Sequence, residues 1–301
     1  MTKIRRRFSG GRVRVIVGVG LAVGFCFQCR ELVSRLNPPT RAPGFGATVA
    51  VANLETPVVE DEATIENTIE RMARKAPLEL LREAQRRYRE NVIDYTCTFQ
   101  KQEQLGGELT KVQETEVKFR EKLQSVYMHW TKNAAKARRV IYVEGKWTKG
   151  GQPAALCEPH GAVARLIVRS IVMPINGPEA KAASRRTIDQ FGFANALNLI
   201  VKYSVMAKQT GELELEYTGE GTVDGRPTYI FKRVLPYTGE GGKYPDRLLV
   251  YHLDKETLLP VMCASYADDK GKELLGQYMY TNVKLNAGLT DADFDGKTYK
   301  L

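Results

Sequence analysis

From residue 92 to residue 285, most of the chain alternates apolar and polar positions with a period of two, which is the pattern of strands with one buried face. Two-glycine and Asp-Gly turns at 105–108 and 223–226 join neighbouring strands as hairpins. Many short strands with short turns predict an antiparallel sheet. The expected strands are 92–104, 108–121, 125–131, 139–144, 155–158, 163–169, 212–219, 222–234, 248–253, 261–267 and 273–285.

Helical spacing of apolar residues interrupts this pattern in two regions. The first runs from residue 63 to residue 88, with Pro77 at a natural first position of a second helical segment. The second region, 187–204, also has apolar residues outside one narrow stripe, so it needs burial over a wide face. The strands and these two regions together predict an α+β fold, in which helices cover the apolar concave face of an open, curved antiparallel sheet.

The chain begins with a segment that has the composition of an export signal. Residues 1–29 contain six cations and no carboxylate, and the uncharged apolar run 15–27 is shorter than the roughly 20 residues that cross a bilayer. We expect a signal peptide or signal anchor at 1–29, a flexible proline-containing tether at 30–62 and a single domain at 63–301. The protein is then periplasmic or envelope-bound, with membrane contact through the N-terminal segment if that segment is not cleaved. Cleavage and the choice between Sec and twin-arginine export stay open.

Charge and cysteine content exclude several classes of function. The formal net charge of +10 falls to +4 without residues 1–29, which argues against nucleic-acid binding. An oxidising compartment permits at most one disulfide among Cys97, Cys157 and Cys263, and their pairing stays open. Cys157 and His160 form only a two-ligand fragment, so we expect no metal and no cofactor.

No residues form a sharp catalytic signature. The three histidines, at 129, 160 and 252, are scattered through separate strands and loops. Asp254 and Glu256 are expected in a solvated turn, and the acids at 291, 293 and 295 lack the spacing of a calcium loop. We therefore expect a protein that is not an enzyme.

Several segments resemble an exported bacterial family of unknown function. They are SVYMHW at 125–130, VIYVEG at 140–145, SRRTIDQFGFANAL at 184–197, LDKETLLP at 253–260 and YMYTNVKLNAGLTDADFD at 278–295. The connection 253–260 is also similar to the turn D-x-x-T-x-L-P of the lipoprotein carriers LolA and LolB. The resemblance covers about residues 79–301. It implies an incomplete barrel, with a strongly curved sheet and an apolar cavity beneath its helices, and it implies no established activity.

These observations favour a non-catalytic envelope protein that binds or carries an acylated or amphiphilic ligand, a lipid or lipoprotein, in that cavity. The alternative is a structural or protein-interaction module of the envelope with a filled core. A void of roughly 300 Å³ or more under the second helical region would favour the carrier. For each apolar candidate, ordinary core packing is the competing explanation. The expected lining residues are Val126, Met128, Trp130, Ile141, Val143, Phe191, Phe193, Leu197, Leu249 and Tyr251, with Arg185 and Arg186 at the cavity mouth.

Overall fold

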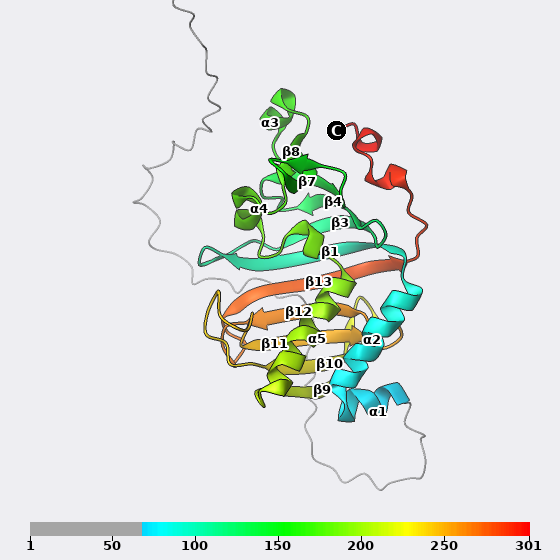
Figure 1. Ribbon diagram of the computed structural model, residues 1–301, viewed down its shortest axis with the longest axis vertical. Coiled ribbons are helices and arrows are strands. Elements are labelled where there is room, and N and C mark those ends of the chain that lie inside the picture. Colours follow the sequence, from blue (N-terminus) through cyan, green and yellow to red (C-terminus); the bar gives the residue numbers. More distant parts are fainter. Residues whose placement is uncertain (1–67) are drawn as a thin grey trace, which may run out of the picture. The chain divides into compact units, whose positions relative to one another are not determined.

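The computed structural model describes residues 68–301, and an antiparallel sheet of 13 strands is their framework (Figure 1). The predicted signal segment, 1–29, and the tether, 30–62, lie outside the described residues, as does the start of the predicted domain, 63–301. Those three predictions therefore stay predictions.

The order of elements along the chain is dominated by strands. The strands are β1 (Asp94–Leu105), β2 (Glu108–Leu109), β3 (Gln113–Arg120), β4 (Ser125–Lys132), β5 (Ala137–Val143), β6 (Thr148–Lys149), β7 (Gln152–Pro159), β8 (Ile171–Pro174), β9 (Glu214–Val223), β10 (Arg226–Val234), β11 (Leu248–Asp254), β12 (Pro260–Tyr266) and β13 (Leu274–Leu285). The helices are α1 (Thr68–Lys75), α2 (Pro77–Asn91), α3 (Ala162–Ile167), α4 (Pro178–Ala183) and α5 (Phe193–Gln209), with 3-10 turns η1 (Ile188–Gln190), η2 (Asp291–Phe294) and η3 (Gly296–Tyr299).

The sheet consists of two series of strands that meet at its centre. β3, β4, β5 and β7 follow β1 on one side, and β12, β11, β10 and β9 follow β13 on the other. β1 and β13 pair antiparallel, so that Phe99 lies opposite Tyr280 and Lys101 lies opposite Tyr278. The first and last long strands of the sheet are therefore its central pair.

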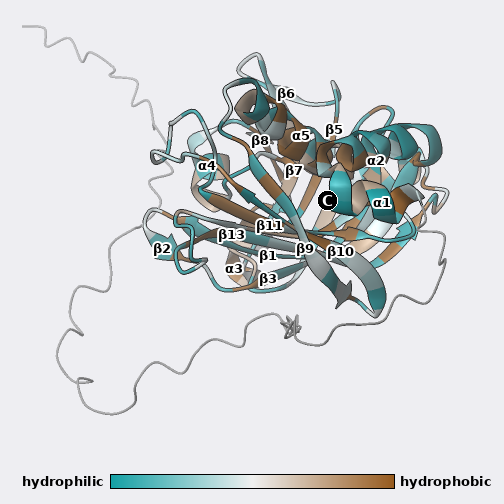
Figure 2. Ribbon diagram, turned by 90° about the horizontal axis from the view of Figure 1, so that it is seen from below, coloured by the Kyte–Doolittle hydropathy of each residue, from teal (hydrophilic) through white to brown (hydrophobic). Residues whose placement is uncertain are grey.

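The long helices lie against one face of the sheet, which curves around α2 and α5 (Figure 2). Gln85 of α2 donates a hydrogen bond from Nε2 to Oδ1 of Asn198 of α5 at 2.7 Å. Leu81 of α2, Phe193 of α5 and Tyr95 of β1 are fully buried in one hydrophobic core between these layers. The predicted fold class, α+β with an open, strongly curved antiparallel sheet, is confirmed.

One glycine shifts the start of the predicted helix 187–204. The segment contains the short turn η1, then Gly192, and α5 begins only at Phe193. Gly192 has a φ of +115°, and a Cβ at this position would lie 2.9 Å from Cε2 of Phe119. A side chain would clash with that ring, so the chain passes the ring as extended glycine backbone before the helix starts.

The prediction of a strand at 163–169 is wrong, because residues of this segment form α3. Val163 and Ile167 are 71% and 78% exposed, so the face that carries these two residues is not the buried face of a strand. Branched apolar residues raise strand propensity only where a half-buried surface receives them. The short helix α4 is an addition that the sequence pattern does not predict.

A buried carboxylate organises the turn between β11 and β12. Asp254 is 1% exposed and accepts hydrogen bonds from Nε of Arg226 at 2.6 Å and from the backbone N–H of Thr257 at 2.8 Å. The expectation of a solvated turn is therefore wrong for Asp254, whereas the side chain of Glu256 is 80% exposed. Burial raises the pKa of Asp254, but the bonds from Arg226 and Thr257 outweigh burial and hold its pKa below the usual value.

We expect the neighbouring His252 to make folding sensitive to pH. His252 is 4% exposed, its Nδ1 lies 3.1 Å from the hydroxyl of Thr228, and burial lowers its pKa to about 4. In the unfolded chain the imidazole of His252 binds a proton near pH 6.5, whereas in the folded protein it does so only near pH 4. The contribution of the neutral imidazole to stability is therefore fully present above pH 6.5 and is lost as the pH falls toward 4. We expect the unfolding free energy from urea titrations to fall by about 3 kcal/mol across this window.

Two variants test the assignment of this slope to one side chain. His252→Asn keeps a hydrogen-bonding group for Thr228 but does not titrate, so its unfolding free energy should change less between pH 6.5 and pH 4. His160→Gln, at an exposed position, should keep the wild-type slope. An unaltered slope in His252→Asn would contradict the prediction.

Candidate ligand-binding cavity

A cavity of about 320 Å³ lies under α4, the segment 183–192 and α5, and its floor is the inner face of the sheet. Strands from both halves of the sheet contribute lining residues, from β7 at one end to β10 at the other. Its walls are predominantly apolar. The main apolar contributors are Phe99, Met128, Trp130, Met173, Phe191 and Tyr280.

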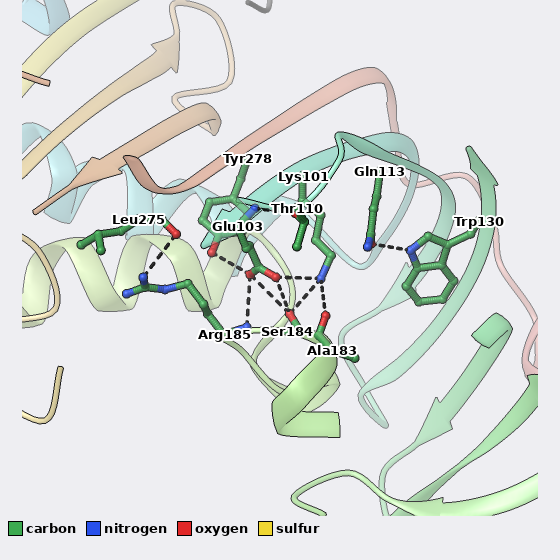
Figure 3. A network of polar contacts seen from close by, with 10 residues as sticks. All are labelled: Lys101, Glu103, Thr110, Gln113, Trp130, Ala183, Ser184, Arg185, Leu275 and Tyr278. Carbon is green, nitrogen blue, oxygen red and sulfur yellow. Dashed lines mark hydrogen bonds and ion pairs between the residues drawn. The ribbon is translucent and has the colours of Figure 1, made fainter. Parts of the chain in front are cut away.

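The roof of the cavity is tied to its floor by a buried polar network centred on Glu103 of β1 (Figure 3). Glu103 is 1% exposed and receives hydrogen bonds from Tyr278 Oη at 2.9 Å and from Ser184 Oγ at 3.1 Å. Nζ of Lys101 lies 2.9 Å from the Glu103 carboxylate and also donates to Ser184 Oγ at 2.9 Å. The segment that follows α4 is therefore held to β1 and β13 by hydrogen bonds to a carboxylate that is itself 1% exposed.

Trp130 forms part of the wall on β4. Its indole Nε1 donates to Oε1 of Gln113 at 2.9 Å, and Gln113 itself is 6% exposed (Figure 3). The polar atom of the indole is thus satisfied, and the rest of the ring presents apolar surface to the cavity. Met128, two positions earlier on the same strand face, lines the cavity beside it.

Charged side chains line the cavity at several points. Five are cationic and three are acidic: Lys101, Lys136, Arg185, Arg186 and Arg233, and Glu103, Glu179 and Asp246. Arg233 is 1% exposed and its Nη2 lies 3.0 Å from the Asp246 carboxylate, so this charge is neutralised inside the protein. Arg185 donates from Nη1 to the carbonyl of Leu275 at 3.2 Å, and Arg186 is exposed. Cationic groups therefore outnumber acids around the cavity.

The structure brings half of the predicted lining residues to the cavity. Those that line it are Met128, Trp130, Phe191, Leu249, Arg185 and Arg186. Val126, Phe193, Leu197 and Tyr251 do not line it and belong instead to the packed core beside it.

Ile141 and Val143 do not line the cavity, and the register of β5 explains why. Ile141 lies opposite Tyr127, and both pack with Phe294 in a second cluster that is separate from the main core. Val140, one position away, lines the cavity instead. A shift of one residue along a strand moves a side chain to the other face of the sheet.

Sequence reasoning missed the charged lining residues on β1 and β10. Phe99, Lys101 and Glu103 follow each other with a period of two, so the pattern itself places both charges on the apolar face of their strand. That signal was available in the sequence. Arg233 follows Tyr229 and Phe231 with the same period, so the pattern also places this charge on the buried face of β10, where Asp246 in the loop before β11 neutralises it.

The cysteines give no reactive group. Cys97, Cys157 and Cys263 are all free thiols, and the last two line the cavity. Burial raises the pKa of Cys157 to about 11 and that of Cys263 to about 12. Both thiols are therefore protonated at neutral pH and are poor nucleophiles.

Acids near the C-terminus have structural partners. Asp293 lies 2.7 Å from Nζ of Lys118, and Asp291 lies 2.8 Å from Nη1 of Arg120. Asp295 accepts a hydrogen bond from the backbone N–H of Lys297. Residues 68–301 contain no cluster of three or more histidine, cysteine or carboxylate side chains that could hold a metal ion.

The chain belongs to a family described as a protein of unknown function, DUF1571, whose model matches residues 92–300. The predicted membership in a family of unknown function is therefore confirmed. A comparison with curated proteins gave no match. Among residues 68–301, none of the helices is both long enough and apolar enough to cross a bilayer.

Comparison with solved structures finds similar chains at low sequence identity and low TM-score. A DUF1329 family protein from Desulfovibrio piger is 16% identical with a TM-score of 0.35, over 75% of this chain and 98% of that chain. A LolA superfamily protein from Nitrosomonas europaea is 9% identical with a TM-score of 0.30, over 72% and 98%. The MucA/MucB complex from Pseudomonas aeruginosa is 14% identical with a TM-score of 0.41, over 73% of this chain and 61% of that chain.

The Glu103 network makes a testable contribution to stability. Lys101→Met should lower the unfolding free energy by about 3 kcal/mol, because the Glu103 carboxylate would stay buried without its counter-charge. Adding Glu103→Gln removes the stranded charge and keeps an acceptor for Tyr278, so the double variant should be more stable than Lys101→Met alone. Denaturant unfolding of both variants measures the difference.

An exposed ion pair provides the control for this experiment. Lys132 pairs with Glu114 at 2.9 Å, but its side chain is 67% exposed, so Lys132→Met should cost less than about 1 kcal/mol. If the double variant were less stable than Lys101→Met, the loss of stability in Lys101→Met would not come from an unpaired, buried Glu103 carboxylate.

Proposed function

We propose that this protein is a non-catalytic binding protein of the cell envelope, which holds the acyl chain of an amphiphilic ligand in the cavity beneath α5. The observation that carries the proposal is an apolar space of about 320 Å³ inside a domain whose remaining core is packed. Pockets that bind small molecules begin at about this size. The alternative, a structural module with a filled core, would not be expected to contain such a space.

The composition of the lining fits an acyl chain. Methionines at positions 128 and 173 supply flexible side chains that adapt to a chain of variable shape. The aromatic rings of Trp130 and Phe191 supply broad apolar surface, and each methylene moved from water to such a surface contributes about 0.8 kcal/mol. Affinity would then grow with chain length until the cavity is full.

The charges around the cavity favour an anionic head group. Arg186 is exposed, lines the cavity and has no carboxylate partner among the described residues. The guanidinium of the neighbouring Arg185 donates to the backbone carbonyl of Leu275. A carboxylate or phosphate at the mouth would find a cationic environment there.

The same cavity is poorly equipped for catalysis. Its two thiols are protonated, and the ammonium of Lys101 is engaged by Glu103 and Ser184. A nucleophile needs a neighbouring base or a lowered pKa. This arrangement supports binding without covalent chemistry, and the predicted export signal at 1–29 supports a location in the envelope.

Trp130→Ala with a fluorescent acyl probe tests the proposal. If the indole lines a space that a ligand can enter, its removal should cost less than the roughly 3 to 5 kcal/mol of emptying a packed aromatic site. Affinity for the probe, measured by fluorescence titration, should fall instead.

Trp147 offers the matched control. It packs in the second cluster, away from the cavity, so Trp147→Ala should leave probe affinity unchanged. If the wild type binds no acyl probe and Trp130→Ala shows the full loss of stability, the hypothesis of a ligand-binding protein is wrong, and the alternative of a structural module with a filled core is supported.

Arg186→Glu tests the head-group part of the proposal separately. The reversal should weaken binding of a long-chain carboxylate or a phosphatidylglycerol by about thirtyfold, because an attraction of about 1 kcal/mol near the surface becomes a repulsion of similar size. Unfolding should be unaffected, since the side chain is exposed. Arg89→Glu, on the exposed face of α2, serves as the control. Equal affinities in all three proteins would remove Arg186 from the site.

A further inference from the structure

A cluster of exposed apolar side chains surrounds α3, which projects beyond β7 and β8 (Figure 1). Among residues 68–301 other than 165 and 166, seven large apolar residues are exposed, and four of them fall within nine consecutive positions. They are Val163, Ile167, Val168 and Ile171, which are 71%, 78%, 39% and 37% exposed. Val163 and Ile167 are four residues apart and therefore lie on the same side of the helix. We refer to these four residues as the α3 patch.

The α3 patch adjoins the ligand cavity. Ile171 of β8 lies opposite Cys157 of β7, and Cys157 lines the cavity. At the other end of α3, the backbone N–H of His160 donates to the carbonyl of Lys136 at 2.8 Å, and Lys136 is an exposed residue of the cavity lining. Both connections to α3 therefore start from the edge of the cavity.

Cations lie close to the α3 patch. Residues 159–178 include two arginines and no aspartate or glutamate, and Glu158 and Glu179 flank this range. Arg169 is exposed, and Nζ of Lys149 donates to the carbonyl of Val172 at 3.0 Å, which places that ammonium beside β8. An open cleft that reaches the first residue of α3 has His129, Asn133, Arg138 and His160 in its lining. Two of these side chains contact acids, since Arg138 lies 3.4 Å from the Glu158 carboxylate and His129 lies 3.1 Å from that of Glu116.

We propose that the α3 patch inserts into the surface of an anionic bilayer and so places the cavity edge against the membrane. Exposed branched apolar residues flanked by cations are the combination that binds the interface of anionic membranes. Docking at the edge of the cavity would also let an acyl chain pass between membrane and cavity without crossing water, where each exposed methylene is unfavourable. This last consequence rests on the proposed function, whereas the docking itself does not.

Tryptophan substitution tests insertion directly. In full-length Ile167→Trp, the emission of the added indole should shift to the blue when phosphatidylglycerol vesicles are added. It should be quenched when the acyl chains of those vesicles are brominated. Leu123→Trp, at a position that is 62% exposed and outside the α3 patch, is the control, because any membrane contact of the N-terminal segment is the same in both proteins. Trp130 and Trp147 contribute the same background to both. Equal quenching of the two added indoles would overturn the proposal.

Lipid composition and oligomeric state identify the occupant of the patch. Quenching should be much weaker with uncharged phosphatidylcholine vesicles, and equal quenching there would overturn the anionic part of the proposal. A dimer in analytical ultracentrifugation that Ile167→Asp dissociates, with no quenching of Ile167→Trp, would assign the patch to a second copy of the chain and overturn membrane docking.

A transfer measurement separates this proposal from the proposed function. Val163→Asp/Ile167→Asp should slow transfer of a fluorescent acyl probe between vesicles at least about tenfold, while the affinity for dispersed probe stays unchanged. Unchanged transfer in this variant would overturn the docking role. If the wild type binds no probe at all, the proposed function fails, and the quenching of Ile167→Trp still decides whether the patch meets a membrane.

Discussion

The antiparallel pairing of β1 with β13 is the constraint on which the rest of the structure depends. It joins residues near position 99 to residues near position 280, so it closes the longest loop in the sheet and places both strands at the centre. Its register sets Lys101 opposite Tyr278, and the next inward position on β1 is Glu103, whose carboxylate Tyr278 reaches. The floor of the cavity and the anchor of its roof are thus fixed by one strand pair. Pairings this distant in sequence are slow to form, because the entropy of loop closure is lost before any contact compensates for it.

Buried charge next to an apolar cavity needs a physical reason. Lys101 with Glu103 and Arg233 with Asp246 are both ion pairs whose members are at least nine-tenths buried. Such pairs contribute little net stability relative to apolar side chains of similar size, since desolvation offsets their attraction. They do specify geometry: besides the neighbouring Lys101, Glu103 accepts hydrogen bonds from groups at defined positions on β13 and on the segment after α4. Apolar contacts alone would let that segment settle onto the floor and fill the space.

The sequence predicted the architecture better than the cavity. Alternation with a period of two is a strong local signal, so the strands that carry Met128, Trp130 and Leu249 are predictable, and those side chains do line the cavity. Which face a strand presents depends on register, which is set by distant partners. Ile141 therefore faces the second cluster, and Val140 takes the place expected of it. The start of α5 depended on the ring of Phe119, a contact that no local pattern contains.

The apolar lining of the cavity is consistent with the proposed occupant. The cavity opens to solvent beside the exposed Arg186 and Lys136, so without a ligand its methionine and phenylalanine side chains face water to which they offer few hydrogen bonds. A ligand with an apolar body and an anionic end would displace that water and contact the exposed cations together. The roof that Glu103 holds in place can thus be understood as keeping open a space that folding alone would favour closing.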